Sequence, residues 1–209
     1  MATGIAIGLM ACSREPSSPG DTLLYQPALY QPQSAQAVVG NPEGNISIVE
    51  FFDYHCVACN AAYPALQSLL QMNPDVRVVY REIPILGEVS VFAARAAVAS
   101  MQQDKYVVMH DALMNVGPAL TDRSVLLIAA HLHVDISQLM QGMNSVFVSN
   151  LLSQNMQYQQ ILGISGTPSY VIAITPWRGT QLTVHKAVLV QGAMTVADFE
   201  RVIDQLGVE

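Results

Sequence analysis

The pattern of apolar and polar positions divides the chain into segments of two kinds. Short β-branched and aromatic runs bounded by turn residues predict buried strands, whereas apolar residues spaced three or four apart predict helices. The predicted strands are Ile46–Phe52, Val76–Ile83, Ser169–Ile174 and Leu182–Val190, with a hairpin through Pro176–Gly179. The predicted helices are Cys56–Gln71, Phe92–Met101, Tyr106–Met114, Ser124–His131, Val146–Ile161 and Val196–Leu206.

The order of these segments predicts an α/β fold. The strands at 46–52 and 76–83 and the helix between them form a βαβ unit, whose parallel strands place the start of the helix at the carboxyl edge of the sheet. Residues from about 88 to 162 contain helix alone and are too many for a simple crossover. We therefore expect a helical subdomain inserted into the sheet domain, with Thr121–Arg123 as the cap of its third helix.

The first forty residues differ from the rest. Met1–Ala11 is small and apolar, and Leu9–Cys12 resembles the lipobox of bacterial lipoproteins, in which the cysteine is acylated. A signal peptide carries a positive amino-terminal region, but no Lys or Arg precedes Arg14. Either the true start lies upstream, or residues 1–12 are an unprocessed tail in which Cys12 is a spare thiol. Residues 13–40 are rich in Ser, Pro, Gln and Gly and are interpreted as a linker.

Composition narrows the function. A length of 209 residues with 51% hydrophobic content fits one domain with its own core. The net charge is -7, and the nine Lys and Arg residues form no cluster, which argues against nucleic acid as a partner. No apolar run approaches the ~18–20 residues of a membrane span.

The strongest chemical signal is the pair Cys56 and Cys59, which opens a helix directly after a predicted central strand. A thiolate on Cys56 would face free backbone N–H groups and the positive end of the helix dipole, and both lower its pKa. Cys59, one turn later, could resolve a mixed disulfide. Half of a zinc site and an inert structural disulfide remain as alternatives. Zinc is disfavoured because no His has ligand-type spacing beside a cysteine pair, so we expect no metal.

These residues resemble a known family. The segment Val49–Cys59 is similar to the active-site segment of the DsbA family of periplasmic disulfide oxidoreductases. Arg81–Gly87 with Ser90 resembles the branch that includes the ScsC-type proteins, and Gly163–Ser169 resembles the family's cis-proline loop. The resemblance implies a thioredoxin-like fold over residues 41–209, with the helical insertion at about 88–162, in an exported protein of the periplasm.

The resemblance also implies roles for individual residues. Pro168 should follow a cis peptide bond, and the backbone of Thr167 should pair with an extended substrate. Glu50 should lie beneath Cys59 and take its proton, with a pKa raised by burial, while Asp53 should be more exposed. His55 could assist a Cys56 thiolate as a cation, or could have no role.

The pair between the cysteines departs from the main oxidase of the family. That enzyme has Pro-His where this chain has Val57-Ala58, and neither of these side chains can donate a hydrogen bond, so we expect a less acidic Cys56 and a less oxidising disulfide. Thr167 resembles the isomerase and reductase members, which are often oligomers joined by an amino-terminal segment. Residues 21–40 could serve that purpose here.

The expected function is the formation or isomerisation of disulfides in unfolded or partly folded exported proteins. The redox-active Cys56–Cys59 pair would need no cofactor, and its electrons would pass to a membrane redox partner. The alternative is an exported lipoprotein or holding chaperone whose disulfide is only structural.

Overall fold

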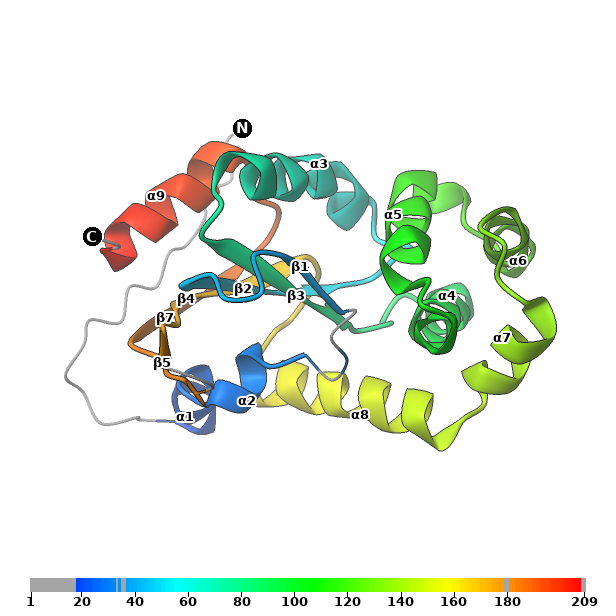
Figure 1. Ribbon diagram of the computed structural model, residues 1–209, viewed down its shortest axis with the longest axis horizontal. Coiled ribbons are helices and arrows are strands. Elements are labelled where there is room, and N and C mark those ends of the chain that lie inside the picture. The colour runs from blue at the N-terminus through cyan, green and yellow to red at the C-terminus, as the bar shows by residue number, and fades with distance from the viewer. Residues whose placement is uncertain (1–17, 33, 35–36, 179–180, 208–209) are drawn as a thin grey trace.

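A five-stranded mixed sheet with helices on both faces forms the body of the molecule, and a group of helices extends from one end (Figure 1). The computed structural model describes residues 18–32, 34, 37–178 and 181–207. The strand order is β1-β3-β2-β4-β7, with β2 parallel to β3 and the other pairs antiparallel. The strands are β1 (Val38–Gly40), β2 (Ile46–Phe52), β3 (Val76–Glu82), β4 (Ser169–Ile174) and β7 (Lys186–Gln191).

The central strand β2 has a core on each side because its residues alternate in direction. Ile46, Ile48 and Phe52 belong to the larger apolar cluster, which includes α3 (Val57–Met72) and α9 (Val196–Leu206). Val49 and Phe51 belong to a second cluster on the opposite face. All seven β2 residues are buried, as the sequence predicted for a central strand.

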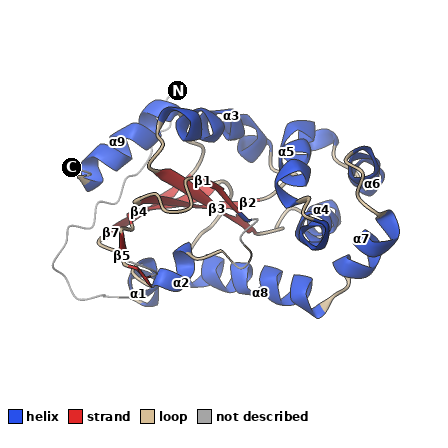
Figure 2. Ribbon diagram, viewed as in Figure 1, coloured by secondary structure: helices blue, strands red, loops and turns tan. Residues whose placement is uncertain are grey.

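The opposite face is covered by three helices, of which two were not predicted. They are α1 (Pro19–Leu24), α2 (Pro27–Tyr30) and α8 (Val146–Ile161), and they run together below the sheet in Figure 2. Leu29 and Tyr30 are completely buried, and Arg77 of β3 donates to the Tyr30 carbonyl oxygen at 2.9 Å. Residues 18–32 are therefore part of the folded domain and differ from the linker expected over 13–40.

The remaining helices form the predicted helical subdomain beyond one end of the sheet (Figure 1). Thr121 is the amino-terminal cap of α6 (Asp122–His131), as predicted, and its side chain accepts a hydrogen bond from the Ser124 N–H. Of the α-helices in this region, only α7 (Ile136–Met143) was missed, and α8 leaves the subdomain to pack against β3. The elements are α4 (Glu88–Ala99), η2 (Ser100–Gln103), α5 (Tyr106–Val116), η3 (Gly117–Ala119), α6 (Asp122–His131) and α7 (Ile136–Met143).

The region after β4 differs in detail from the prediction. Gly179, in the expected hairpin, lies outside the described residues. On either side of it, β5 (Trp177–Arg178) and β6 (Gln181–Leu182) pair as a small separate sheet, and the next long strand begins at Lys186. Within the described part of the chain, no helix is both long and apolar enough to cross a membrane.

Candidate active site

Cys56 caps the amino end of α3, and that position determines its chemistry. Its backbone is extended and the helix begins at Val57, so the sulfur meets the free N–H groups of Ala58 and Cys59. The sulfur also donates to the Thr167 carbonyl oxygen at 3.3 Å. A hydrogen bond from the Cys59 thiol lowers the pKa of Cys56 to about 5, against the effect of burial. The Thr167 side chain and the two backbone N–H groups lower this pKa further.

Cys59 has the opposite character. It is completely buried, whereas Cys56 keeps 8% of its surface exposed. The hydrogen bond to Cys56 raises the pKa of Cys59 far above its ordinary value, and burial adds to this shift. Both residues are free thiols in this structure. Near neutral pH the reduced pair therefore holds one thiolate, on the more accessible sulfur, and one thiol beneath it.

The loop of the predicted cis proline lies against Cys56. The peptide bond between Thr167 and Pro168 is cis, which confirms the prediction. The loop is held on both sides, because Gly192 N donates to the Pro168 carbonyl oxygen at 2.9 Å and Ser169 Oγ donates to the Gly166 carbonyl oxygen at 2.8 Å. Thr167 itself is only half-buried and borders the sulfur.

Glu50 lies in β2, on the sheet face that α3 covers. It is completely buried, and neither carboxyl oxygen has a hydrogen-bond partner among the described residues. Burial raises its pKa to about 8, as the sequence analysis expected for an acid beneath the second cysteine. Its charge in turn adds to the upward shift of the Cys59 pKa. Glu50 can therefore exchange a proton near neutral pH.

Asp53 is not exposed, so that expectation was wrong. It keeps only 2% of its surface, and its carboxylate accepts hydrogen bonds from the backbone N–H groups of His55 at 2.8 Å, Ile85 at 2.8 Å and Leu86 at 3.0 Å. Two of these donors are more than thirty residues away, which the local sequence could not indicate. Asp53 thus fixes the loop before Cys56 to the loop after β3.

The side chain of His55 makes no hydrogen bond with the described residues, and only its backbone N–H is used, by Asp53. The residue is half-buried beside Cys56. Its assistance to the thiolate stays a prediction.

Sequence analysis gave His110 no part in the site, yet its ring lies at the centre of an aromatic cluster under the cysteine loop. The ring stacks on Tyr80 with centroids 3.9 Å apart, and Nδ1 is 3.0 Å from the Tyr54 hydroxyl. Burial lowers its pKa to about 3, so the imidazole is neutral. The buried positions 106, 109, 110, 113 and 114 of α5 have helical spacing, and this was the signal that could have identified it.

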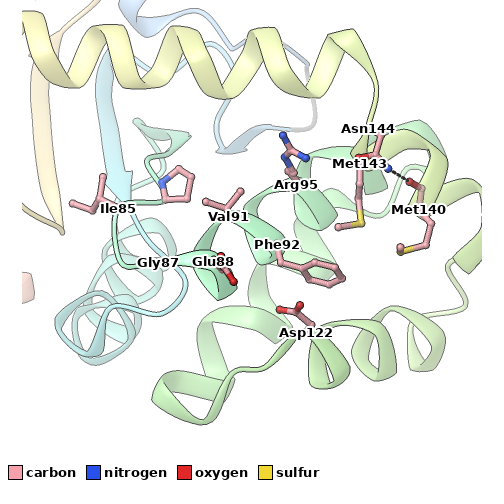
Figure 3. A pocket seen from close by; sticks show the side chains of 11 residues that line it. Ile85, Gly87, Glu88, Val91, Phe92, Arg95, Asp122, Met140, Met143 and Asn144 are labelled. Carbon is pink, nitrogen blue, oxygen red and sulfur yellow. Dashed lines mark hydrogen bonds between the residues drawn. The ribbon is translucent and has the colours of Figure 1, made fainter.

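A groove of about 490 Å³ lies on the far side of the loop that Asp53 holds. Figure 3 shows it along α4, between the loop after β3 and helix α7. Its lining is mainly apolar, with one guanidinium and two carboxyl groups. The lining residues are Pro84, Ile85, Gly87, Glu88, Val91, Phe92, Arg95, Asp122, Met140, Met143 and Asn144.

Cys12, the predicted acylation site, lies outside the described residues. Among the residues that are described, no three His, Cys, Asp or Glu side chains are grouped so that they could hold a metal ion.

A mixed thioredoxin-type sheet, a helical insertion, two cysteines at a helix start and a cis-proline loop together define a class of protein. The chain matches the DSBA-like thioredoxin domain family over residues 47–203 and belongs to that family. The family resemblance and the thioredoxin-like α/β fold are thus confirmed.

Individual relatives agree with this assignment. A thioredoxin-like oxidoreductase from Silicibacter pomeroyi DSS-3 is 38% identical, with a TM-score of 0.71 over 85% of this chain and 95% of that one. The thiol-disulfide exchange protein alpha-DsbA2 from Wolbachia pipientis is 25% identical, with a TM-score of 0.66 over 81% and 86% of the two chains. The catalytic domain of Proteus mirabilis ScsC, at 24% identity and a TM-score of 0.70 over 86% and 92%, shares the fold.

A curated relative is much longer. The Na(+)/H(+) antiporter NhaA 3 of Salinispora tropica is 28% identical over 137 residues, which are 65% of this chain and 21% of the antiporter. The match thus spans about a fifth of that protein.

Proposed function

We propose that this protein is an exported thiol–disulfide oxidoreductase that forms or isomerises disulfides in unfolded or partly folded proteins through Cys56 and Cys59. The observation that carries the proposal is the asymmetry of the pair, in which Cys56 has a pKa of about 5 and Cys59 is buried with a raised pKa. A low-pKa thiolate is both a nucleophile and a good leaving group at neutral pH.

The exchange proceeds in two displacements. When the enzyme acts as an oxidant, a substrate thiolate attacks the Cys56 sulfur of the disulfide, and Cys59 leaves and takes a proton from Glu50. A second substrate thiolate then attacks the substrate sulfur of the mixed disulfide and releases Cys56 as a thiolate. The substrate loses two electrons, and the enzyme gains them as the reduced pair. A membrane redox partner would reoxidise the pair, and no other cofactor is required.

An extended polypeptide fits the surface around Cys56. Val57 directly follows it and is 62% exposed, and Leu86, in the loop held by Asp53, is 47% exposed. No described residue accepts a hydrogen bond from the Thr167 N–H, so this group is free to pair with a substrate strand. These features favour a segment with exposed apolar side chains, which is what an unfolded protein offers.

The direction of the reaction depends on how strongly the Cys56 thiolate is stabilised. A pKa of about 5 lies between about 7 for thioredoxin and about 3.5 for DsbA. Because a stabler thiolate makes a more oxidising disulfide, we propose a reduction potential between those of the two proteins. This agrees with the expectation from Val57-Ala58 that the disulfide is less oxidising than in the main oxidase.

The alternative of a purely structural disulfide is less consistent with this site. A disulfide that is only structural has no need of a stabilised thiolate, and its two cysteines, when reduced, would have ordinary or raised pKa values. Periplasmic location and acylation at Cys12 are part of the proposal. Oligomerisation through residues 21–40 also stays a prediction, and it would have to use the exposed side chains of this segment because Leu24, Leu29 and Tyr30 are buried in their own domain.

The test compares Cys56→Ser with Cys59→Ser in a Cys12→Ser background, which removes the third thiol. We expect Cys56→Ser to abolish the refolding of a scrambled disulfide substrate, and Cys59→Ser to trap mixed disulfides through Cys56. In the parent protein, iodoacetamide should modify Cys56 with a pH midpoint near 5, because the thiolate is the reactive form. Refolding activity that survives Cys56→Ser would refute the proposed function.

A further inference from the structure

Three buried polar atoms beneath the cysteines have no hydrogen-bond partner among the described residues. They are the two carboxyl oxygens of Glu50 and the hydroxyl oxygen of Tyr170. Buried polar groups are almost always hydrogen-bonded, either to protein or to an ordered water molecule. Orphaned groups of this kind that lie in one place therefore require a partner that the described residues do not supply in the arrangement seen here.

The register of the sheet brings these atoms together. Glu50 of β2 is directly opposite Tyr170 of the antiparallel strand β4. Side chains at such positions point to the same face, with Cβ atoms about 4.5–5.5 Å apart. On the other side, Glu50 pairs with Tyr80 of β3, so that one carboxyl group lies between two tyrosines.

The two tyrosines differ in what their hydroxyl groups contact. The Tyr80 hydroxyl oxygen accepts a hydrogen bond from Gln67 Nε2 at 3.2 Å. The Tyr170 hydroxyl group has no such partner, and the charged groups that act on it are Glu50, Cys59 and Cys56. In addition to burial, both sulfurs and Glu50 raise the pKa of Tyr170, whereas Glu50 but neither sulfur raises that of Tyr80.

The ring of Tyr170 is held in place. Phe199 of α9 packs edge-on against it, with ring centroids 5.0 Å apart and an interplanar angle of 81°. Because the strand fixes the backbone and α9 fixes the ring, the hydroxyl group stays on the sheet face that holds the Glu50 carboxyl group.

We propose that Tyr170 is a positioning residue for Glu50, and that its hydroxyl group donates a hydrogen bond to the carboxylate through one internal water molecule. The proposal rests on the proposed function and gives one of its residues a partner. Donation to the charged form of an acid favours that form. The Glu50 carboxylate adds to the raised pKa values of Cys59 and Tyr63 of α3, Tyr80 of β3 and Tyr170 of β4, and none of these neighbours is a cation.

The hydroxyl group matters most when Cys59 attacks. The proton of Cys59 passes to the Glu50 carboxylate, and the Cys59 thiolate attacks the Cys56 sulfur of a mixed disulfide. The Cys56–Cys59 bond forms, and the substrate leaves as a thiolate with the electron pair of the broken bond. Tyr170 keeps its own proton and holds the carboxylate ready to accept one.

The experiment removes a single oxygen atom with Tyr170→Phe and uses Tyr80→Phe as the matched control. Carbon-13 NMR of the Glu50 carboxyl group gives its titration directly. For Tyr170→Phe we expect a proton affinity about tenfold higher, as for the loss of one hydrogen bond to a charged group. Release of substrate from the mixed disulfide at pH 7 should slow by about the same factor. Tyr80→Phe should change both quantities less than about twofold.

An unchanged Glu50 titration in Tyr170→Phe would overturn the proposal, as would equal shifts in the two variants. The NMR titration does not depend on activity. If the wild-type protein failed to exchange disulfides while Tyr170→Phe still shifted the titration, the proposed function would fail and the hydrogen bond would stand.

Discussion

The two faces of the central sheet both bury charge, but they surround it differently. On the face covered by α1, α2 and α8, Arg77 donates to Ser47 Oγ at 2.7 Å and to the Tyr30 carbonyl oxygen. Arg81 donates to the carbonyl oxygens of Leu29 at 3.1 Å and Gln31 at 2.7 Å. On the face covered by α3 and α9, the Glu50 carboxyl group has no partner among the described residues.

This difference distinguishes buried charges that stabilise the fold from a buried charge that takes part in the reaction. A buried charge that is hydrogen-bonded stabilises one conformation, and removing it leaves its partners unsatisfied. A buried charge without partners lowers stability whenever it is ionised, so its retention requires another benefit. We infer that the arginines attach helix α2 to the sheet, whereas Glu50 is kept for proton exchange.

Glu50→Gln should have the largest effect on the free energy of unfolding. The folded-state pKa of about 8 lies above the ordinary value of 4.5, so the folded protein binds the proton more tightly than the unfolded chain. The stability from this group is complete below about pH 4.5 and is lost as the pH rises through about 8. At about 1.4 kcal/mol per pKa unit, the loss in the wild type is several kcal/mol.

Urea denaturation from pH 4 to pH 9, with Cys56 and Cys59 oxidised, measures this loss. Glu50→Gln should lack the decline and be the more stable protein at pH 9, because the amide stays neutral. Replacement of the exposed Glu43 by Gln is the control. Parallel stability curves for the wild type and Glu50→Gln would show that Glu50 is not desolvated.

Arg81→Met should have the next largest effect on the free energy of unfolding. This residue lies on the face of the sheet that α1, α2 and α8 cover. Methionine fills much of the space but donates no hydrogen bonds, so the carbonyl oxygens at the end of α2 lose their donors. We expect a loss of about 3 kcal/mol in urea denaturation at pH 7. The folded protein should keep its exchange activity, since Arg81 takes no part in the proposed exchange steps.

Arg95→Met is the control for Arg81→Met, because Arg95 is half-buried on α4 and makes no hydrogen bond with the described residues. It should cost less than about 0.5 kcal/mol. If both variants lost the same stability, the hydrogen bonds of Arg81 would not be the reason for its burial.

The same contrast explains what the sequence could predict. The strand at 46–52 and the helix at 196–206 have the predicted bounds, because their own apolar patterns determine them. The cysteine pair and the cis proline were identified from local motifs. Each of these features is encoded within a short stretch of chain.

The features that were missed depend on distant partners. The short helix α1 packs against α8, more than a hundred positions away, and the four-residue helix α2 is held by arginines about fifty positions away. The buried Asp53 accepts hydrogen bonds from the N–H groups of residues 85 and 86, and the buried His110 is hydrogen-bonded to the tyrosine at position 54. No local pattern records such contacts. The local signals that could have been used are the Asp135 cap of α7, which accepts from Gln138 N, the Ser18 cap of α1 and the helical spacing of the buried positions of α5.

Ser47→Ala should have the smallest effect on the free energy of unfolding. It tests whether the hydrogen bond from Arg77 to Ser47 stabilises the fold. Ser47 Oγ accepts the Nε hydrogen of Arg77 at 2.7 Å and is 2.5 Å from the Thr175 hydroxyl oxygen. Alanine leaves the Arg77 Nε–H unpaired in a buried place, so we expect a loss of about 1–2 kcal/mol in urea denaturation and no change in exchange rate.

Thr175→Val is the matched variant, because it removes the neighbouring hydroxyl group but leaves the acceptor of Arg77 in place. If Thr175→Val cost as much as Ser47→Ala, the hydroxyl pair and not the arginine would account for the stability. The contrast between the two faces of the sheet would then depend on Arg81 alone.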